Sequence, residues 1–142
     1  TVSVNASTNV GDSVTLAPGA DYTLAVYGNA AAPDWRLISD DNRPPASGER
    51  AKMRLLHMAS GLNANLTLVK DYVAVATDVA YGNASSYSQV ANSNDARVEV
   101  TSPLTVDPLF LSEDAVLASR GVYTVFVLGG AATPTGILRR ER

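Results

Sequence analysis

The chain has 142 residues, of which 46% are hydrophobic and 18% charged, and its net charge is −3. This length suits one domain, or one domain with part of another, and the hydrophobic fraction is enough for a packed core. The acidic balance argues against nucleic-acid binding, the absence of Cys excludes disulfides and Cys-based zinc sites, and no apolar run of about 18 residues predicts a membrane span.

Short strand-like runs separated by turn residues follow one another along the chain. The strongest runs span residues 22–27, 53–58, 65–69, 96–101 and 123–128. In the fourth run, Val98 and Val100 alternate with charged residues, which places the two valines on one face of a strand. Gly, Pro and Asn mark the turns, and no segment sustains the apolar stripe of a helix. The pattern predicts an all-β fold, an immunoglobulin-like antiparallel β-sandwich.

An internal repeat is the clearest sign of domain organisation. Residues 16–33 align without a gap on residues 117–134, at an offset of 101 residues, and half of the aligned positions are identical. Such an offset matches the length of one immunoglobulin-like domain. We therefore predict a full β-sandwich over residues 49–142, preceded over residues 1–48 by the C-terminal part of another copy and a linker. Because the chain begins in the middle of this pattern, we expect it to be a piece of a longer precursor.

The strands of the N-terminal half copy lack the partners that the full copy has. Residues 14–28 either lie against an edge of the 49–142 domain, giving one enlarged sandwich, or exchange strands with a second molecule. The first is favoured because a short linker keeps the effective concentration high. Tyr22 and Tyr123, which the repeat aligns, are expected to be tyrosine corners at equivalent strand positions with similar burial.

Five motifs follow in a fixed order over the second part of the chain. They are Arg54–Ser60, Leu66–Val69, Ala80–Gly82 with Tyr87, Arg97–Thr101 and Gly121–Gly129. In these motifs residues 51–138 resemble the bacterial domain of unknown function family DUF4397, and residues 14–50 resemble the tail of a preceding copy. Where the family usually continues the first motif with Pro-Asp, this chain has Gly61-Leu62, so a role for an acidic residue in that loop is in doubt. The resemblance implies a secreted or surface-anchored β-sandwich, often in tandem, and no known reaction.

The residues that could carry chemistry are few. His57 is the only histidine and would have to be the base of any Ser-His-Asp triad. It lies in an apolar run, and no Gly-x-Ser-x-Gly motif supplies a nucleophile, so we interpret its ring as structural and bonded to the backbone. Acidic clusters at 40–42, 94–95 and 113–114 lack the spacing of a calcium loop and are interpreted as solvated loops, with a weak calcium site as the alternative. No catalytic residue, metal ligand or cofactor is predicted.

Three aromatic residues are candidates for a ligand patch. Trp35, Tyr72 and Tyr81 could form a platform on which sugar rings stack, and the alternative for each is a structural role.

The sequence predicts a non-catalytic module of the cell envelope or the secreted space. Its work would be adhesion, binding or structural spacing in a tandem array, with an unknown surface protein or glycan as partner and self-association through the N-terminal strands. The low charged fraction is typical of extracellular β proteins, which predicts an extracytoplasmic location: secreted, periplasmic or a cell-surface lipoprotein. The alternative is a hydrolase or hydrolase-accessory domain acting on surface polymers, which a His57 bonded to both a carboxylate and a serine would favour.

Overall fold

The computed structural model describes residues 2–4, 8–10 and 13–142, and this part of the chain consists of strands and turns. None of its segments is a helix with the length and apolar character needed to cross a membrane. The strands are β1 (Val2–Val4), β2 (Thr8–Val10), β3 (Asp21–Asn29), β4 (Ala32–Asp40), β5 (Arg50–His57), β6 (Leu66–Lys70), β7 (Val73–Val79), β8 (Asn83–Ala84), β9 (Ser88–Ala91), β10 (Ser93–Thr101), β11 (Phe110–Leu117), β12 (Val122–Gly130) and β13 (Thr133–Arg140).

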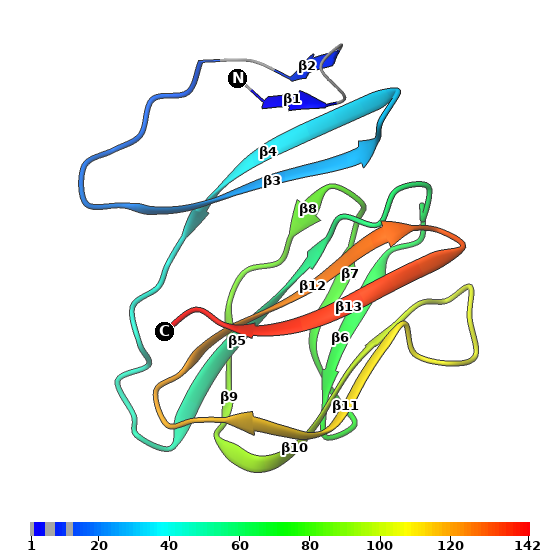
Figure 1. Ribbon diagram of the computed structural model, residues 1–142. Helices are drawn as coiled ribbons and strands as arrows, with labels where there is room; N and C mark the ends of the chain where they lie inside the picture. Colours follow the sequence, from blue (N-terminus) through cyan, green and yellow to red (C-terminus); the bar gives the residue numbers. More distant parts are fainter. Residues whose placement is uncertain (1, 5–7, 11–12) are drawn as a thin grey trace.

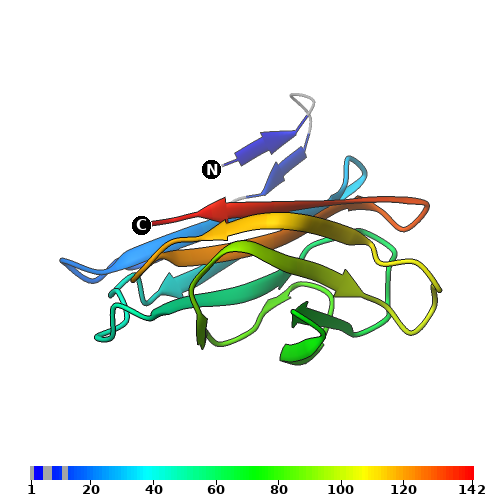
Figure 2. The ribbon, with the colours of Figure 1, turned by 90° about the horizontal axis from the view of Figure 1, so that it is seen from below.

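Two sheets pack face to face as a β-sandwich (Figures 1 and 2). The first has the order β11-β10-β6-β7, and the second has the order β13-β12-β5, with β8 and β9 both paired to β5. The predicted all-β sandwich is confirmed. One pair departs from the antiparallel pattern, because β5 and β12 run parallel from Lys52 beside Val122 to His57 beside Val127.

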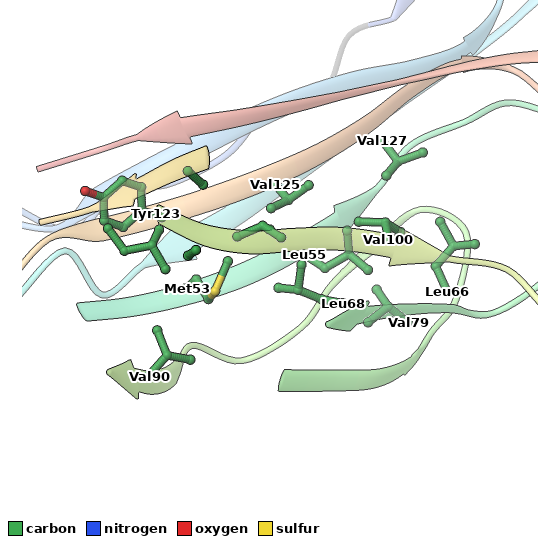
Figure 3. Close-up of a cluster of buried hydrophobic side chains, with 14 of the residues drawn as sticks. Met53, Leu55, Leu66, Leu68, Val79, Val90, Val100, Tyr123, Val125 and Val127 are labelled. Carbon is green, nitrogen blue, oxygen red and sulfur yellow. The ribbon is translucent and has the colours of Figure 1, made fainter. Parts of the chain in front are cut away.

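The hydrophobic core lies between these two sheets. Val98 and Val100 of β10 are fully buried in it, as their alternation with charged residues predicts. Figure 3 shows Leu55 and Val125 of one sheet in the same cluster as Leu68 and Val100 of the other. Each such side chain contributes roughly 1.5–3 kcal/mol through burial, so the core accounts for the stability of the sandwich without disulfides.

Strand β5 is buried on both of its faces. Met53 and Leu55 point into the core, while Lys52, Arg54 and Leu56 alternate with them and are buried on the opposite face. A strand with one face open to water would expose that second set. The hairpin β3-β4 covers it instead, lying against the outer face of the second sheet (Figure 1).

The hairpins β3-β4 and β12-β13 are built alike. At the 101-residue offset of the sequence, β3 begins and ends where β12 does, and β4 begins where β13 does. Both turns depend on a glycine with positive φ, +90° at Gly28 and +87° at Gly129. A side chain there would approach the carbonyl oxygen of the following strand, which explains why both turns keep glycine.

Each hairpin also carries the predicted tyrosine hydrogen bond. The hydroxyl of Tyr22 accepts from the backbone N–H of Ala17 at 3.1 Å, and the hydroxyl of Tyr123 accepts from that of Ala118 at 2.7 Å. Their burial differs, because Tyr123 lies in the core and Tyr22 is only half-buried. The expectation of similar burial was therefore wrong: in the described part of the chain, no sheet like β11-β10-β6-β7 covers the Tyr22 side of the hairpin.

The hairpin β3-β4 packs onto the sandwich within the same chain, but not at an edge. In the described residues, β3 pairs only with β4, so the prediction that residues 14–28 extend a sheet of the domain was wrong. The contact is face to face, since the buried charges of Lys52 and Arg54 on β5 need partners, and Asp40 and Asp41 at the end of β4 supply them.

Candidate functional site

The candidate site is the interface between the hairpin β3-β4 and the outer face of β5 and β12, which we call the joint. At its centre is Arg54, whose side chain is 2% exposed. Arg54 Nη2 lies 2.7 Å from Oδ1 of Asp40, whose own side chain is 7% exposed. An ion pair removed from water to this extent requires several compensating hydrogen bonds. The interpretation of Asp40 as part of a solvated loop was wrong, because its carboxylate is the buried partner of Arg54.

Two threonines supply part of that compensation. Thr23 Oγ1 donates to Asp40 Oδ2 at 2.6 Å, and Arg54 Nε donates to Thr124 Oγ1 at 3.1 Å. Arg54 Nη2 also lies 3.4 Å from Thr23 Oγ1. Thr23 and Thr124 are aligned by the sequence repeat, so one guanidinium contacts the same position of both hairpins.

Tyr87 closes the joint beside these charges. Its ring centroid is 4.6 Å from the guanidinium carbon of Arg54 and 4.7 Å from Nζ of Lys52, which is cation–π geometry. Burial raises the pKa of Tyr87, so the ring stays neutral. Lys52 is also 3.3 Å from the carboxylate of Asp41, whose pKa is held well below its usual range by hydrogen bonds from Arg43 first and Lys52 second. The cations of β5 thus meet anions from the end of β4.

Aromatic and amide contacts extend the joint to β8. The rings of Tyr27 and Tyr81 meet edge to face, with centroids 5.5 Å apart and planes at 84°. Gly82 has φ +75°, and a Cβ there would lie 2.9 Å from the hydroxyl oxygen of Tyr27, so glycine makes room for the tyrosine. Arg36 of β4 donates a hydrogen bond to the side-chain oxygen of Asn83.

His57 lies under this interface, fully buried. Its Nε2 is 3.0 Å from the carbonyl oxygen of Leu62 and 3.1 Å from that of Ala64, as the expectation of backbone hydrogen bonds requires. Because both neighbours are acceptors, we assign the proton of the neutral ring to Nε2. Nδ1 has no hydrogen-bond partner among the described residues. Burial lowers the pKa of His57, against the two carbonyl contacts that raise it.

In the part of the chain that the structure describes, His57 does not have the neighbours that would favour a hydrolase, a carboxylate and a serine hydroxyl. Among the described residues, its Nε2 bonds to two backbone carbonyls, Nδ1 has no partner, and neither nitrogen bonds to a carboxylate or a serine hydroxyl. A hollow of about 480 Å³ between β7 and β8 has Asp78 and Ser85 in its lining, but His57 does not line it.

The three aromatic ligand candidates lie on different elements. Trp35 is half-buried on β4, opposite Val26 of β3. Tyr72 is 80% exposed in the β6–β7 turn, where it has φ +65° and its ring lies 5.3 Å from the guanidinium of Arg97. Tyr81 is half-buried in the joint. Within the described part no ring contact joins any two of them, and their binding a ligand stays a prediction.

The acidic clusters at 94–95 and 113–114 are exposed but lie on the strands β10 and β11, so their interpretation as loops was wrong. Glu113 pairs with Arg97 at 2.8 Å, and Asp95 accepts a hydrogen bond from the hydroxyl of Ser93. Over residues 2–4, 8–10 and 13–142, no three His, Asp or Glu side chains gather in a way that could hold a metal ion.

Sequence reasoning missed the joint. Its signal is the alternation of Lys52 and Arg54 with apolar residues in a strand that is otherwise hydrophobic. A cation in such a strand requires either solvent or an anion from elsewhere, and the sequence does not say which.

A known family model matches the N-terminal part of the chain. The model described as Domain of unknown function (DUF4397) matches residues 1–66, from β1 to the first residue of β6, and confirms the resemblance to that family. Of the stretch 51–138 in which the motifs lie, the match covers residues 51–66. No curated protein matches the chain.

Proposed function

We propose that this chain, whose residues 1–66 match the DUF4397 family model, is a non-catalytic module that spaces copies of its own fold in a tandem array outside the cytoplasm. The observation that carries the proposal is the buried Arg54–Asp40 ion pair, which fastens the hairpin β3-β4 to the sandwich that follows it. A spacer must hold a fixed angle between successive units. The hydrogen bonds from Thr23 to Asp40 and from Arg54 to Thr124 fix the orientation of the two charges, since hydrogen bonds to charged groups are directional.

The segment between β4 and β5 supports the same role. It contains Pro44 and Pro45, which stiffen a chain that glycine and serine would leave flexible. Pro45 is buried, and its carbonyl oxygen accepts a hydrogen bond from Nε of Arg120 at 3.0 Å. The connection is thus tied to the sandwich at Pro45, through Arg120, and at Asp41, through Lys52.

The likeness of the two hairpins supports the tandem arrangement. They share strand limits, glycine turns and tyrosine hydrogen bonds at a constant offset, as expected of two copies of one fold. The extracytoplasmic part of the proposal rests on the low charged fraction, and fractionation of the producing cells tests it.

A distance measurement between hairpin and sandwich tests the spacer role. Because the chain has no Cys, Ala31→Cys in the β3–β4 turn and Val106→Cys in an exposed loop give two unique spin labels. We expect a single narrow distance distribution. Arg54→Met and Asp40→Ala should each broaden the distance distribution, since removing one partner leaves the other charge buried and unpaired. Arg97→Met, which removes a surface ion pair of the opposite sheet, is the control and should leave it narrow. A broad distribution in the unmodified chain, or no response to Arg54→Met, contradicts a rigid joint.

The non-catalytic part has its own test. A screen of esterase, glycosidase and peptidase substrates should give no turnover that depends on His57. Turnover lost in His57→Ala would establish the hydrolase alternative.

A further inference from the structure

The hairpin β3-β4 has a second face, which points away from the joint and is largely apolar. We call it the bare face. It includes the half-buried Trp35 and Leu37 of β4, which lie directly opposite Val26 and Leu24 of β3. The exposed large side chains of β3 and of the segment before it are Val14 (47%), Leu16 (55%), Leu24 (52%) and Val26 (42%).

The positions 101 residues further on belong to the core of the sandwich. Their exposures are Ala115 5%, Leu117 1%, Val125 0% and Val127 0%. Val125 lies opposite Leu138 just as Leu24 lies opposite Leu37. Val125 and Val127 are thus buried in one hairpin, while Leu24 and Val26 at the equivalent positions of the other are open to water. Ala115 and Leu117 lie on β11, in the sheet that packs over β12. The difference is the sheet that covers β12 and β13, which the N-terminal hairpin lacks in the described part.

The described part of the chain keeps one strand of such a cover. β2 contacts β4 as β11 contacts β13, and residues 9–10 of β2 lie 101 positions before the first two residues of β11. The hairpin β3-β4 with β2 therefore resembles a sandwich from which the remaining strands of one sheet are missing.

The free edge of β3 adds a requirement for hydrogen bonding. One edge of β12 pairs with β13 and the other with β5 in parallel. In the described residues β3 pairs with β4 alone, so its other edge offers backbone groups in the position where a β5-like strand would bind.

We propose that the bare face is the inner face of a second sandwich, completed by a segment equivalent to β5–β10 from a preceding copy of the fold on the same polypeptide. This inference rests on the tandem arrangement proposed above and names what the array places on the hairpin. A second molecule of this chain is a poorer occupant, because its β11-β10-β6-β7 sheet is already closed over its own β12. The bare face of the hairpin would then be part of the core of one domain, and the joint would connect the same hairpin to the next domain.

Duplication of the chain's own strands tests the proposal directly. Residues 49–116 in place of residues 1–15 put Leu16 after Val116, as Leu117 follows it in the natural sequence. Trp35 is the only tryptophan and lies on the bare face, so its fluorescence reports on this face alone. We expect its emission to shift to shorter wavelength and acrylamide quenching to fall several-fold. Leu68→Asp in the added segment only should restore quenching. Unchanged quenching, with the added segment protected from hydrogen exchange, overturns the proposal.

Two matched double variants of the natural chain keep the proposal testable if the duplicated chain does not fold. Leu24→Ser with Val26→Ser should leave the urea midpoint of the chain unchanged, because both side chains are exposed in this chain. Val125→Ser with Val127→Ser, the equivalent change in the core, should abolish the cooperative transition. A comparable loss in the first variant would show that the face is already covered within this chain and would overturn the proposal.

Light scattering tests the remaining possible occupant of the bare face, a second molecule of this chain. A natural chain that dimerises, and becomes monomeric with Leu24→Ser and Val26→Ser, would assign the bare face to a second molecule instead. None of these variants touches Arg54 or Asp40, so their outcome is independent of the distance measurement on the joint.

Discussion

At the scale of single residues, His57 shows how burial sets the behaviour of a titratable group. The ring is fully buried, its Nε2 faces two carbonyl oxygens, and among the described residues Nδ1 would have to accept a proton with no hydrogen-bond partner for it. The folded chain therefore resists protonation, and the pKa of His57 is lowered.

The stability of the protein should depend on pH through this residue. The pKa of His in the unfolded chain is about 6.5, so below that pH the unfolded state binds a proton that the folded state does not. The free energy of unfolding should be unaffected by His57 above about pH 6.5 and should fall as the pH drops below it, by up to about 1.4 kcal/mol per pH unit. Urea denaturation between about pH 5 and pH 8 measures this slope.

His57→Gln is the matched variant for this measurement. It should lose stability at every pH but show a flatter slope below about pH 6.5, because glutamine does not titrate. The slope that remains comes from the carboxylates, which are unchanged. An equal slope in both proteins would assign the acid sensitivity to other groups.

At the scale of the elements, the two hairpins offer an internal comparison. Gly28→Ala and Gly129→Ala make the same change at nearly the same φ. Each added methyl would meet a carbonyl oxygen, that of Ala32 at 2.5 Å and that of Thr133 at 2.8 Å. A residue with a side chain costs about 1–2 kcal/mol in such a left-handed conformation. Because β12 lies in the middle of the second sheet, Gly129→Ala should lower the stability of the whole sandwich.

The N-terminal hairpin should respond locally to its own substitution. Gly28→Ala should raise hydrogen exchange in β3 and β4 while β10 and β12 keep their protection, because the hairpin contributes only to the joint. Exchange measured by mass spectrometry distinguishes the two patterns. Equal loss of protection in β10 for both variants would mean that hairpin and sandwich unfold as one unit.

The strands also show most clearly how much of the structure could be predicted from the sequence. The strands β10 and β12 could be predicted because alternation or a continuous apolar run identifies them. The strands β4 and β13 could not, since each has a proline near its start, at Pro33 and Pro134, which disfavours a strand. Both are hairpin arms that pair along one edge only, where proline is tolerated.

The site was less predictable than the fold. His57 could be interpreted as structural because a lone histidine in an apolar strand has few alternatives. Asp40 was misassigned since its neighbours Asp41, Asn42 and Arg43 read as a solvated segment, whereas its burial depends on Arg54 at the far side of the linker. Contacts between distant segments leave no local pattern, so the joint had to come from the structure.

At the scale of the whole molecule, the path of the chain determines what an array would look like. The chain enters the sandwich at the start of β5 and leaves it after β13, and both points flank the start of β12. The N–H of Lys52 bonds to the carbonyl of Gly121, and the N–H of Val122 bonds to that of Arg142. Entry and exit therefore lie at one end of the module, and successive copies would stack side by side, adding less length than copies joined end to end.

This placement of the two ends has a mechanical consequence. A pull on both ends would load the β5-β12-β13 ladder from one end, so its hydrogen bonds would break one after another and not all together. Each bond contributes only about 1 kcal/mol net, and yielding under load follows the rate of unfolding, not the equilibrium stability. An array of such modules would lengthen at low force, one copy at a time, and would recoil when the load is removed, behaving as a soft tether and not as a stiff rod.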